Sequence, residues 1–416
     1  MDDDLIVFET WLKDNGAKIG NLSMQNKING EREVVSKRNL KTNSNIVKIP
    51  HKLIITDEHG ENTHYGQCLL NGDYSKINNL GITLVAIYIL TTFNTNCFFK
   101  PYYDILPTNI NHFPIFWSKR ELSQLQGSDI LNKISDRIES FKNDYSVIVE
   151  NCPGFKEKYP FKHFVYVRTL IGSRNFGINV NGKKRVAMIP FADMLNHAAS
   201  PSTKWYYSQQ DNCFNMDMNE SINSNIEITD TYGRKCNSKY LLFYGFVLPN
   251  NNNNNTVTVK LKQNVDDLYN EKNKLFPSFT GELDTNLEST TFQELFSFLR
   301  ISAATNEELV RFELKSDFNK PLNKSNEYNA LHNLYLLIEN LERNYIKSYN
   351  DLIQKSKSVK PFTKEYSTII YILGELEILL FYKNLASTFM EQLQNGDKKT
   401  DNKYKIYQAI IHKIVT

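Results

Sequence analysis

The chain has 416 residues, of which 41% are hydrophobic and 12% aromatic, and 49 Lys and Arg against 46 Asp and Glu leave a formal charge of +3. This length and apolar content suit a globular protein of two or three domains rather than a single core. The near balance of charge argues against a partner that is a nucleic acid or an anionic membrane, because such partners select for concentrated Lys and Arg.

Five scattered cysteines show neither C-x-C nor C-x-x-C spacing: Cys68, Cys97, Cys152, Cys213 and Cys236. An odd number without ligand spacing predicts reduced thiols and no structural metal. The acidic start, Asp2 to Asp4, differs from a basic targeting segment, so we expect an intracellular protein of the cytoplasm, the nucleus or both. The longest apolar stretch, 369–381, is interrupted by Glu375 and Glu377, which predicts a buried helix and no membrane span.

The N-terminal third predicts one helix and then strands. Phe8, Trp11 and Leu12 indicate a short amphipathic helix that ends near Asn15-Gly16. Short β-like runs follow between residues 33 and 56.

Helical periodicity then extends from about residue 60 to 164, with Ser118 and Glu121 in capping-box form. Between residues 168 and 246 the β-like runs return, broken by turn signals. We therefore expect four segments, bounded as 1–60, 61–164, 165–250 and 251–416.

Six consecutive asparagines, 250–255, stand between the apolar runs 246–248 and 257–259. A polar tract of this kind lacks the means to pack, which predicts a solvated hairpin tip without function.

The remainder predicts helices. Thr291 with Glu294 and Thr305 with Glu308 have capping-box form. Apolar and aromatic residues then step by three and four along one helical face: Leu334, Ile338, Leu341, Tyr345, Tyr349 and Leu352. A second long helix, from about 364 to 393, is expected to pack against it.

Two short motifs concentrate hydrogen-bonding side chains. The apolar run that begins at Ile189-Pro190 ends in Asp193, Asn196 and His197, and polar groups with such flanks need partners from elsewhere in the chain. Some 35 residues later come Thr231-Tyr232-Gly233 and then Tyr244-Gly245-Phe246.

These motifs in this order resemble the SET-domain protein methyltransferases, in the branch typified by Rubisco large-subunit lysine methyltransferase and its relatives. Residues 100–107 and 117–127 are similar to that branch's helical insert. The resemblance implies an α+β protein, in which a split SET β-fold with a helical insert is followed by an all-α C-terminal substrate-binding lobe.

The resemblance also implies residue roles. Tyr232 would be the catalytic tyrosine, whose hydroxyl lies near the sulfonium methyl of S-adenosyl-L-methionine. The remaining cofactor residues would be Gly30, Arg174, Asp193, Asn196, His197, Tyr244, Gly245 and Phe246. Arg174 would pair with the cofactor's carboxylate, whereas Asp193 is expected to anchor its loop by accepting backbone amides.

The acceptor channel would be lined by Phe176, Ala192 and Tyr244. The branch that methylates a histidine of actin carries an Asn and a Trp where this chain has Phe176 and Ala192, so an apolar ring and a small residue favour lysine. The chain's length and its Tyr232 to Tyr244 spacing are closer to the histidine branch.

The expected function is therefore transfer of a methyl group from S-adenosyl-L-methionine to a lysine amine of a protein substrate, by a monomer. Two alternatives stay open. One is methylation of an actin histidine. The other is a non-catalytic SET-fold binding module, because Asn29-Gly30-Glu31 offers a single glycine where the family has a Gly-x-Gly-like turn.

Overall fold

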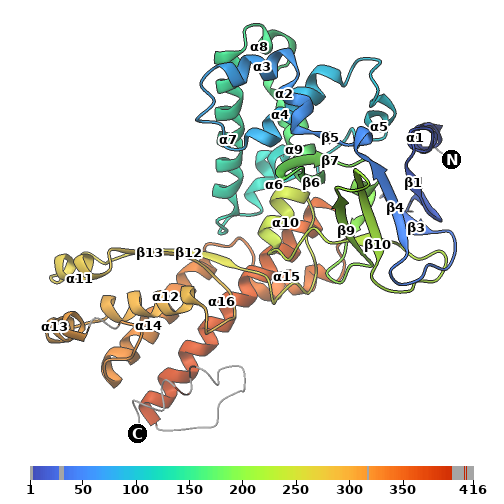
Figure 1. Cartoon of the computed structure of the whole chain (residues 1–416). Coiled ribbons are helices and arrows are strands. Elements are labelled where there is room, and N and C mark those ends of the chain that lie inside the picture. The colour runs from blue at the N-terminus through green and yellow to red at the C-terminus, as the bar shows by residue number, and fades with distance from the viewer. Residues whose placement is uncertain (1–2, 28–31, 316–317, 396–406, 408, 410–416) are drawn as a thin grey trace. The chain divides into compact units, whose positions relative to one another are not determined.

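The computed structural model describes residues 3–27, 32–315, 318–395, 407 and 409 (Figure 1). The chain divides into two compact units, Met1–Asn111 with Ser135–Arg234 and His112–Ile134 with Lys235–Thr416. The division cuts across the four segments expected from the sequence, because residues 112–134 belong with the second unit and the later boundary falls at residue 234. The α+β class is confirmed.

Short strands make up the sheets of the first unit. Their bounds are β1 Lys18–Ile19, β2 Leu22–Asn26, β3 Arg32–Ser36, β4 Asn45–Pro50, β5 Ile55–Thr56, β6 Asn175–Val180, β7 Lys183–Met188, β8 Asn196–His197, β9 Thr203–Ser208, β10 Cys213–Met218 and β11 Thr229–Asp230. The largest sheet has the antiparallel order β1-β4-β10-β9, and a second has the order β5-β7-β6. Both combine strands from before residue 57 with strands from after residue 174, as a split core requires.

Helices of the first unit pack around a buried ion pair. Their bounds are α1 Asp3–Asp14, α2 Asp57–Glu61, α3 His64–Asn71, α4 Leu80–Thr92, α5 Lys100–Asp104, α7 Ile130–Asn151 (in this unit from Ser135), α8 Phe155–Lys158 and α9 Phe161–Arg174, with the 3₁₀ turns η1 His51–Leu53 and η3 Ala192–Met194. Arg168 of α9 donates from Nη1 to Asp144 Oδ2 (2.8 Å) and to Thr83 Oγ1 (2.6 Å). These contacts tie α9, which leads directly into β6, to α7 and α4.

The second unit is mainly helical. Its elements are η2 Pro114–Phe116, α6 Lys119–Ser123, α10 Asn237–Tyr244, β12 Val257–Lys262, α11 Tyr269–Leu275, β13 Ser278–Leu283, α12 Thr290–Ser302, α13 Asn306–Lys315, α14 Lys324–Arg343, α15 Tyr349–Ser356 and α16 Lys364–Asn395. α16 packs along α14, which confirms the second long helix (Figure 1).

Capping explains where the sequence predictions hold and where they are wrong. The boxes at Ser118–Glu121 and Thr305–Glu308 are present. The box at Thr291 is wrong, because the Ser289 hydroxyl accepts from the Phe292 amide (3.1 Å) and starts α12 earlier. The continuous face 334–352 is also wrong, because the Ser348 hydroxyl accepts from the Asp351 amide (3.2 Å) and starts a new helix.

The asparagine tract is not a solvated hairpin tip. Asn251 and Asn255 are 7% and 4% exposed, and β12 pairs instead with β13. The Asn255 side chain accepts from the Asn237 amide (3.1 Å), and Asn251 Nδ2 donates to the Lys235 carbonyl oxygen (2.9 Å). Side-chain amides can pack when each polar atom finds a partner, which the composition argument overlooked.

In the described part of the chain, no helix is long and apolar enough to span a bilayer. The same residues contain no group of three His, Cys, Asp or Glu side chains that could hold a metal ion. All five cysteines are free thiols.

Candidate functional site

A strained turn begins the site. Phe191, which is fully buried, has φ 73° and ψ −47° and directly precedes η3. A bulky residue with positive φ costs on the order of 1–3 kcal/mol and persists only where its surroundings enforce it. The turn closes with hydrogen bonds from the Asp193 amide to the Ile189 carbonyl oxygen (3.1 Å) and from the Met194 amide to the Phe191 carbonyl oxygen (3.1 Å).

Asp193 anchors this turn through side chains, which corrects the expectation that it accepts backbone amides. Tyr102 donates its hydroxyl to Asp193 Oδ2 (2.7 Å), and Arg174 Nη1 contacts the same oxygen (3.3 Å) and the Asp193 carbonyl oxygen (2.8 Å). Burial raises the pKa of Asp193 while Arg174 opposes that rise, and Asp193 in turn raises the pKa of Arg174. The pair is ionised, because Asp193 Oδ2 accepts from both the Arg174 guanidinium and the Tyr102 hydroxyl.

Asn196 makes two side-chain hydrogen bonds, one to β3 and one to Glu227. Its Nδ2 donates to the Arg32 carbonyl oxygen (2.9 Å) and to Glu227 Oε1 (2.8 Å). Glu227 Oε2 also pairs with Lys27 Nζ (2.9 Å). Gly30 itself lies outside the described residues, but the residues on either side of 28–31 are tied to Asn196 and Glu227.

His197 and Tyr232 lie against each other. β8 and β11 pair in parallel, with Asn196 opposite Thr229 and His197 opposite Asp230. The Tyr232 amide donates to His197 Nδ1 (3.1 Å), which places the neutral ring's proton on Nε2. The two rings stack at 5.3 Å, and the Tyr232 hydroxyl donates to the Leu195 carbonyl oxygen (2.9 Å). Tyr232 thus contacts the residues on both sides of Asn196.

Phe176 belongs to an aromatic cluster. Its ring contacts Trp205 edge-on at 5.5 Å and Phe214 at 5.3 Å, and Trp205 stacks on Phe214. Ala192 is 1% exposed, and Arg174, two residues before Phe176, contacts its neighbour Asp193. Phe176 therefore presents an aromatic face and Ala192 a small buried side chain.

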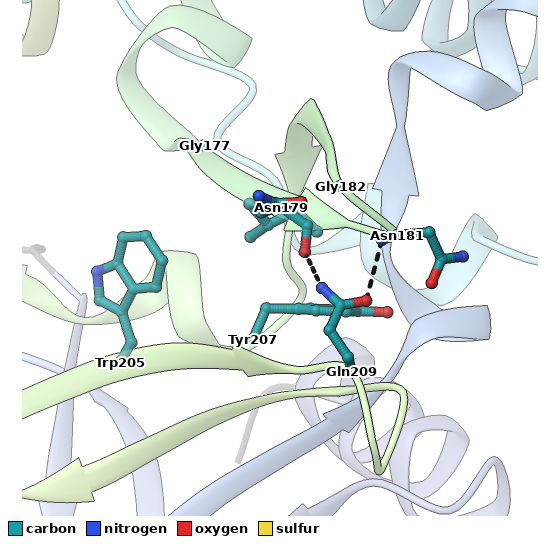
Figure 2. Close-up of a pocket in the computed structure, with 8 residues that line it drawn as sticks. Gly177, Asn179, Asn181, Gly182, Trp205, Tyr207 and Gln209 are labelled. Carbon is teal, nitrogen blue, oxygen red and sulfur yellow. Dashed lines mark hydrogen bonds between the residues drawn. The ribbon is translucent and has the colours of Figure 1, made fainter.

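A pocket of about 410 Å³ adjoins this cluster between the β6–β7 hairpin and β9. Figure 2 shows Trp205 and Tyr207 on β9 with Gly177 and Asn179 opposite, and Gln209 bridging to the hairpin. Gln209 donates to the Asn179 carbonyl oxygen and accepts from the Asn181 amide. The lining carries no ionisable acid or base apart from the Tyr207 phenol.

Tyr244, Gly245 and Phe246 belong to the second unit. Tyr244 ends α10, and Gly245 caps it with φ 77°, where an added Cβ would lie 2.3 Å from His112 Cδ2. Phe246 stacks on Tyr240 at 5.2 Å, and Lys235 Nζ lies 5.7 Å from the Tyr244 ring centroid.

Sequence reasoning missed the residues that hold the predicted ones in place: Lys27, Arg32, Tyr102, Glu227 and Asp230. One signal was available, because Asp230 stands where the alternation of Ile226 and Ile228 predicts an apolar residue. An acid in a strand so close to Tyr232 calls for a partner or a role.

Comparisons with known proteins agree with this architecture. A family model described as Rubisco LSMT substrate-binding matches residues 263–379. Relatives named actin-histidine N-methyltransferase from Papio anubis and Homo sapiens are each 24% identical over 89% of this chain. The chain spans 66% of the length of these relatives.

Solved structures of LSMT share the fold. The SET domain of LSMT bound to lysine and AdoHcy aligns with a TM-score of 0.76 at 19% identity, covering 94% of this chain and 93% of that one. Rubisco LSMT bound to sinefungin and monomethyllysine aligns with a TM-score of 0.77 at 18% identity, covering 98% and 100%. The chain therefore shares the fold of LSMT, and residues 263–379 match the Rubisco LSMT substrate-binding model.

Proposed function

We propose that this protein is an S-adenosyl-L-methionine-dependent protein methyltransferase that acts on the side-chain amine of a lysine. The observation that carries the proposal is the arrangement around Asn196: Tyr232 is fixed by the Leu195 carbonyl oxygen and by His197, while Asn196 donates to the Arg32 carbonyl oxygen of β3. The relatives' names and the ligands of the LSMT structures support the reaction class.

The donor set fits an adenosyl sulfonium cofactor. Arg174 offers a guanidinium suited to the carboxylate of a methionine moiety, although Asp193 already holds one of its nitrogens. Asn196 and His197, which lie beside Tyr232, are proposed to contact the same moiety, and Gly30 stays a proposed cofactor residue. The bound cofactor would supply an electrophilic methyl group. Tyr232 would orient the acceptor nitrogen with its hydroxyl, so that rate comes chiefly from alignment and electrostatics.

The acceptor preference rests on Phe176 and its surroundings. An aromatic face attracts cationic methylammonium groups, and Phe176 offers no hydrogen-bond partner to an imidazole. Trp205 extends this face toward the pocket of Figure 2, which we propose receives the acceptor's neighbouring residues. Tyr244, Gly245 and Phe246 remain proposed contributors from the second unit.

Histidine methylation of actin is the second candidate, because the actin-histidine relatives match most of the chain. In either case the partner is a protein, for which the helical lobe matched by the substrate-binding model is the proposed docking domain. We propose that the protein acts as a monomer inside the cell, in the cytoplasm, the nucleus or both.

The test is incubation of the full chain with labelled S-adenosyl-L-methionine, a cell extract depleted of endogenous activity, and purified actin. Mass spectrometry then locates the label. We expect label on lysine and a loss of about 100-fold in rate for Tyr232→Phe, as for removal of one positioned hydroxyl. Label on an actin imidazole would establish the second candidate.

Transfer that does not exceed the Tyr232→Phe control would contradict both candidates. Calorimetry with S-adenosylhomocysteine then identifies the remaining alternative, since a non-catalytic module that has lost its cofactor gives no heat of binding. The control variant is Tyr206→Phe, which removes an exposed hydroxyl from β9 and should leave the rate within twofold.

A further inference from the structure

Asp230 is a buried acid without sufficient hydrogen-bond partners, two residues before Tyr232. It is 2% exposed, and among the described residues its Oδ1 has no partner. The Thr231 amide and the Thr203 hydroxyl reach the carboxylate. The Thr203 hydroxyl also donates to the Thr229 carbonyl oxygen (2.9 Å), and its single proton serves only one acceptor at a time. The carboxylate is therefore left short of donors.

The position of Asp230 connects the tyrosine with the aromatic cluster. Across the β8–β11 pair it lies opposite His197, whose ring stacks on Tyr232. On its other side it meets Thr203, which shares one face of β9 with Trp205 because strand residues alternate. Trp205 contacts Phe176. A row of neighbouring side chains thus runs from Tyr232 through Asp230 and Thr203 to the proposed acceptor channel.

We propose that Asp230 is the counter-charge for the acceptor amine and selects a lysine over a neutral imidazole. This inference rests on the proposed function. During transfer the S–CH₃ bond breaks as the N–CH₃ bond forms, so one positive charge moves from sulfur to the acceptor nitrogen. The Asp230 carboxylate attracts the side chain as its ammonium ion, which passes one proton to water and attacks as the neutral amine. A carboxylate facing that nitrogen then stabilises the positive charge that develops in the transition state and stays on the methylammonium product.

The proposed role of Asp230 and a purely structural role predict opposite effects of Asp230→Asn on stability. Burial raises the pKa of Asp230 to about 6, opposed by Thr231 and Thr203. The folded state therefore prefers the neutral acid, and ionisation destabilises the fold as pH rises from about 4 to 6. The other titratable or charged groups nearby are His197, Tyr232 and Lys204, the last on the exposed face of β9. Asp230→Asn should raise the melting temperature at pH 7.5, whereas loss of a purely structural anchor would lower it.

The test uses the full chain saturated with S-adenosylhomocysteine and titrated with L-lysine, L-norleucine or L-histidine at pH 8. The three probes share the same α-groups and differ in side-chain charge. Asp230→Asn should weaken L-lysine binding at least tenfold and change L-norleucine and L-histidine binding less than twofold. The control Asp211→Asn makes the same change at an exposed turn between β9 and β10 and should have no effect.

A second measurement needs no variant. Wild-type affinity for L-lysine should fall as pH drops below about 6, while L-norleucine affinity stays constant. Unchanged L-lysine affinity in Asp230→Asn, or a wild-type affinity independent of pH, overturns the role of Asp230 while S-adenosylhomocysteine binding persists. Loss of S-adenosylhomocysteine binding by the wild type would instead contradict the proposed function, and this inference with it.

Discussion

Arg174 and Asp193 show how single residues hold a strained turn. Asp193 has no exposed side-chain surface, and its partners Arg174 and Tyr102 come from α9 and α5. The ion pair fixes the backbone that follows Phe191. Without it, Phe191 could relax from its strained positive φ. An acid that looked like a local loop anchor in the sequence is thus a junction between three segments.

Removing Arg174 should expose this dependence. Arg174→Met leaves Asp193 buried with only the Tyr102 hydroxyl, and we expect a loss of about 3 kcal/mol at pH 8. The pKa of Asp193 rises further in this variant, so the folded state takes up a proton and part of the loss is recovered near pH 5. Urea unfolding of the wild type and the variant at pH 8 and pH 5 measures the loss of stability and its recovery. Arg174→Lys keeps the charge, and an equal loss there would contradict the electrostatic explanation.

At the scale of elements, α16 carries a buried acid that ties three segments together. Glu375 Oε1 accepts the hydroxyls of Tyr371 (2.7 Å) and Ser128 (2.9 Å), and Oε2 accepts that of Tyr345 (3.1 Å). Burial raises the pKa of Glu375 to about 7. The glutamate that interrupts the apolar stretch of the sequence is therefore a partnered group inside the lobe.

Glu375 should make the stability depend on pH. The folded state keeps its proton up to about pH 7, whereas an unfolded glutamate loses it near pH 4.5. Stability should therefore fall by about 3 kcal/mol as pH rises from 4.5 to 7. Glu375→Gln should flatten this slope in thermal unfolding scans. Glu365→Gln, on the exposed first turn of the same helix, should leave the slope in place.

The asparagine tract offers a test with its control in the same six residues. Asn255→Ala leaves the Asn237 amide without its acceptor, and we expect a loss of about 1–3 kcal/mol. Asn253 is exposed, so Asn253→Ala should change stability by less than about 0.5 kcal/mol. If Asn255→Ala and Asn253→Ala change the free energy of unfolding equally in denaturant titrations, the hydrogen bond of the buried Asn255 does not stabilise the fold. Gly374 belongs to the same contact, because an added Cβ would lie 2.5 Å from Asn255 Nδ2.

For the whole molecule, the sequence was sufficient for the fold class, the resemblance to LSMT and the long helix α16, because these depend on motifs and periodicity. It also predicted that Tyr232, Asn196 and His197 would lie together, although their chemical roles stay predictions. It could not reveal the contacts of Tyr102, Lys27 and Glu227, which depend on segments 31 to 200 residues apart. The unit boundaries were equally hidden, since residues 112–134 have ordinary helical periodicity and only tertiary contacts assign them to the second unit.

The discontinuity of the second unit has a consequence for synthesis. Ser128 leaves the ribosome 247 residues before its partner Glu375, and translation at about 5–20 residues per second makes that interval roughly 12–50 s. During that interval the apolar side chains of residues 112–134 lack the partners that they contact in the second unit. Nascent chains stalled between these two points are where chaperones should be needed most.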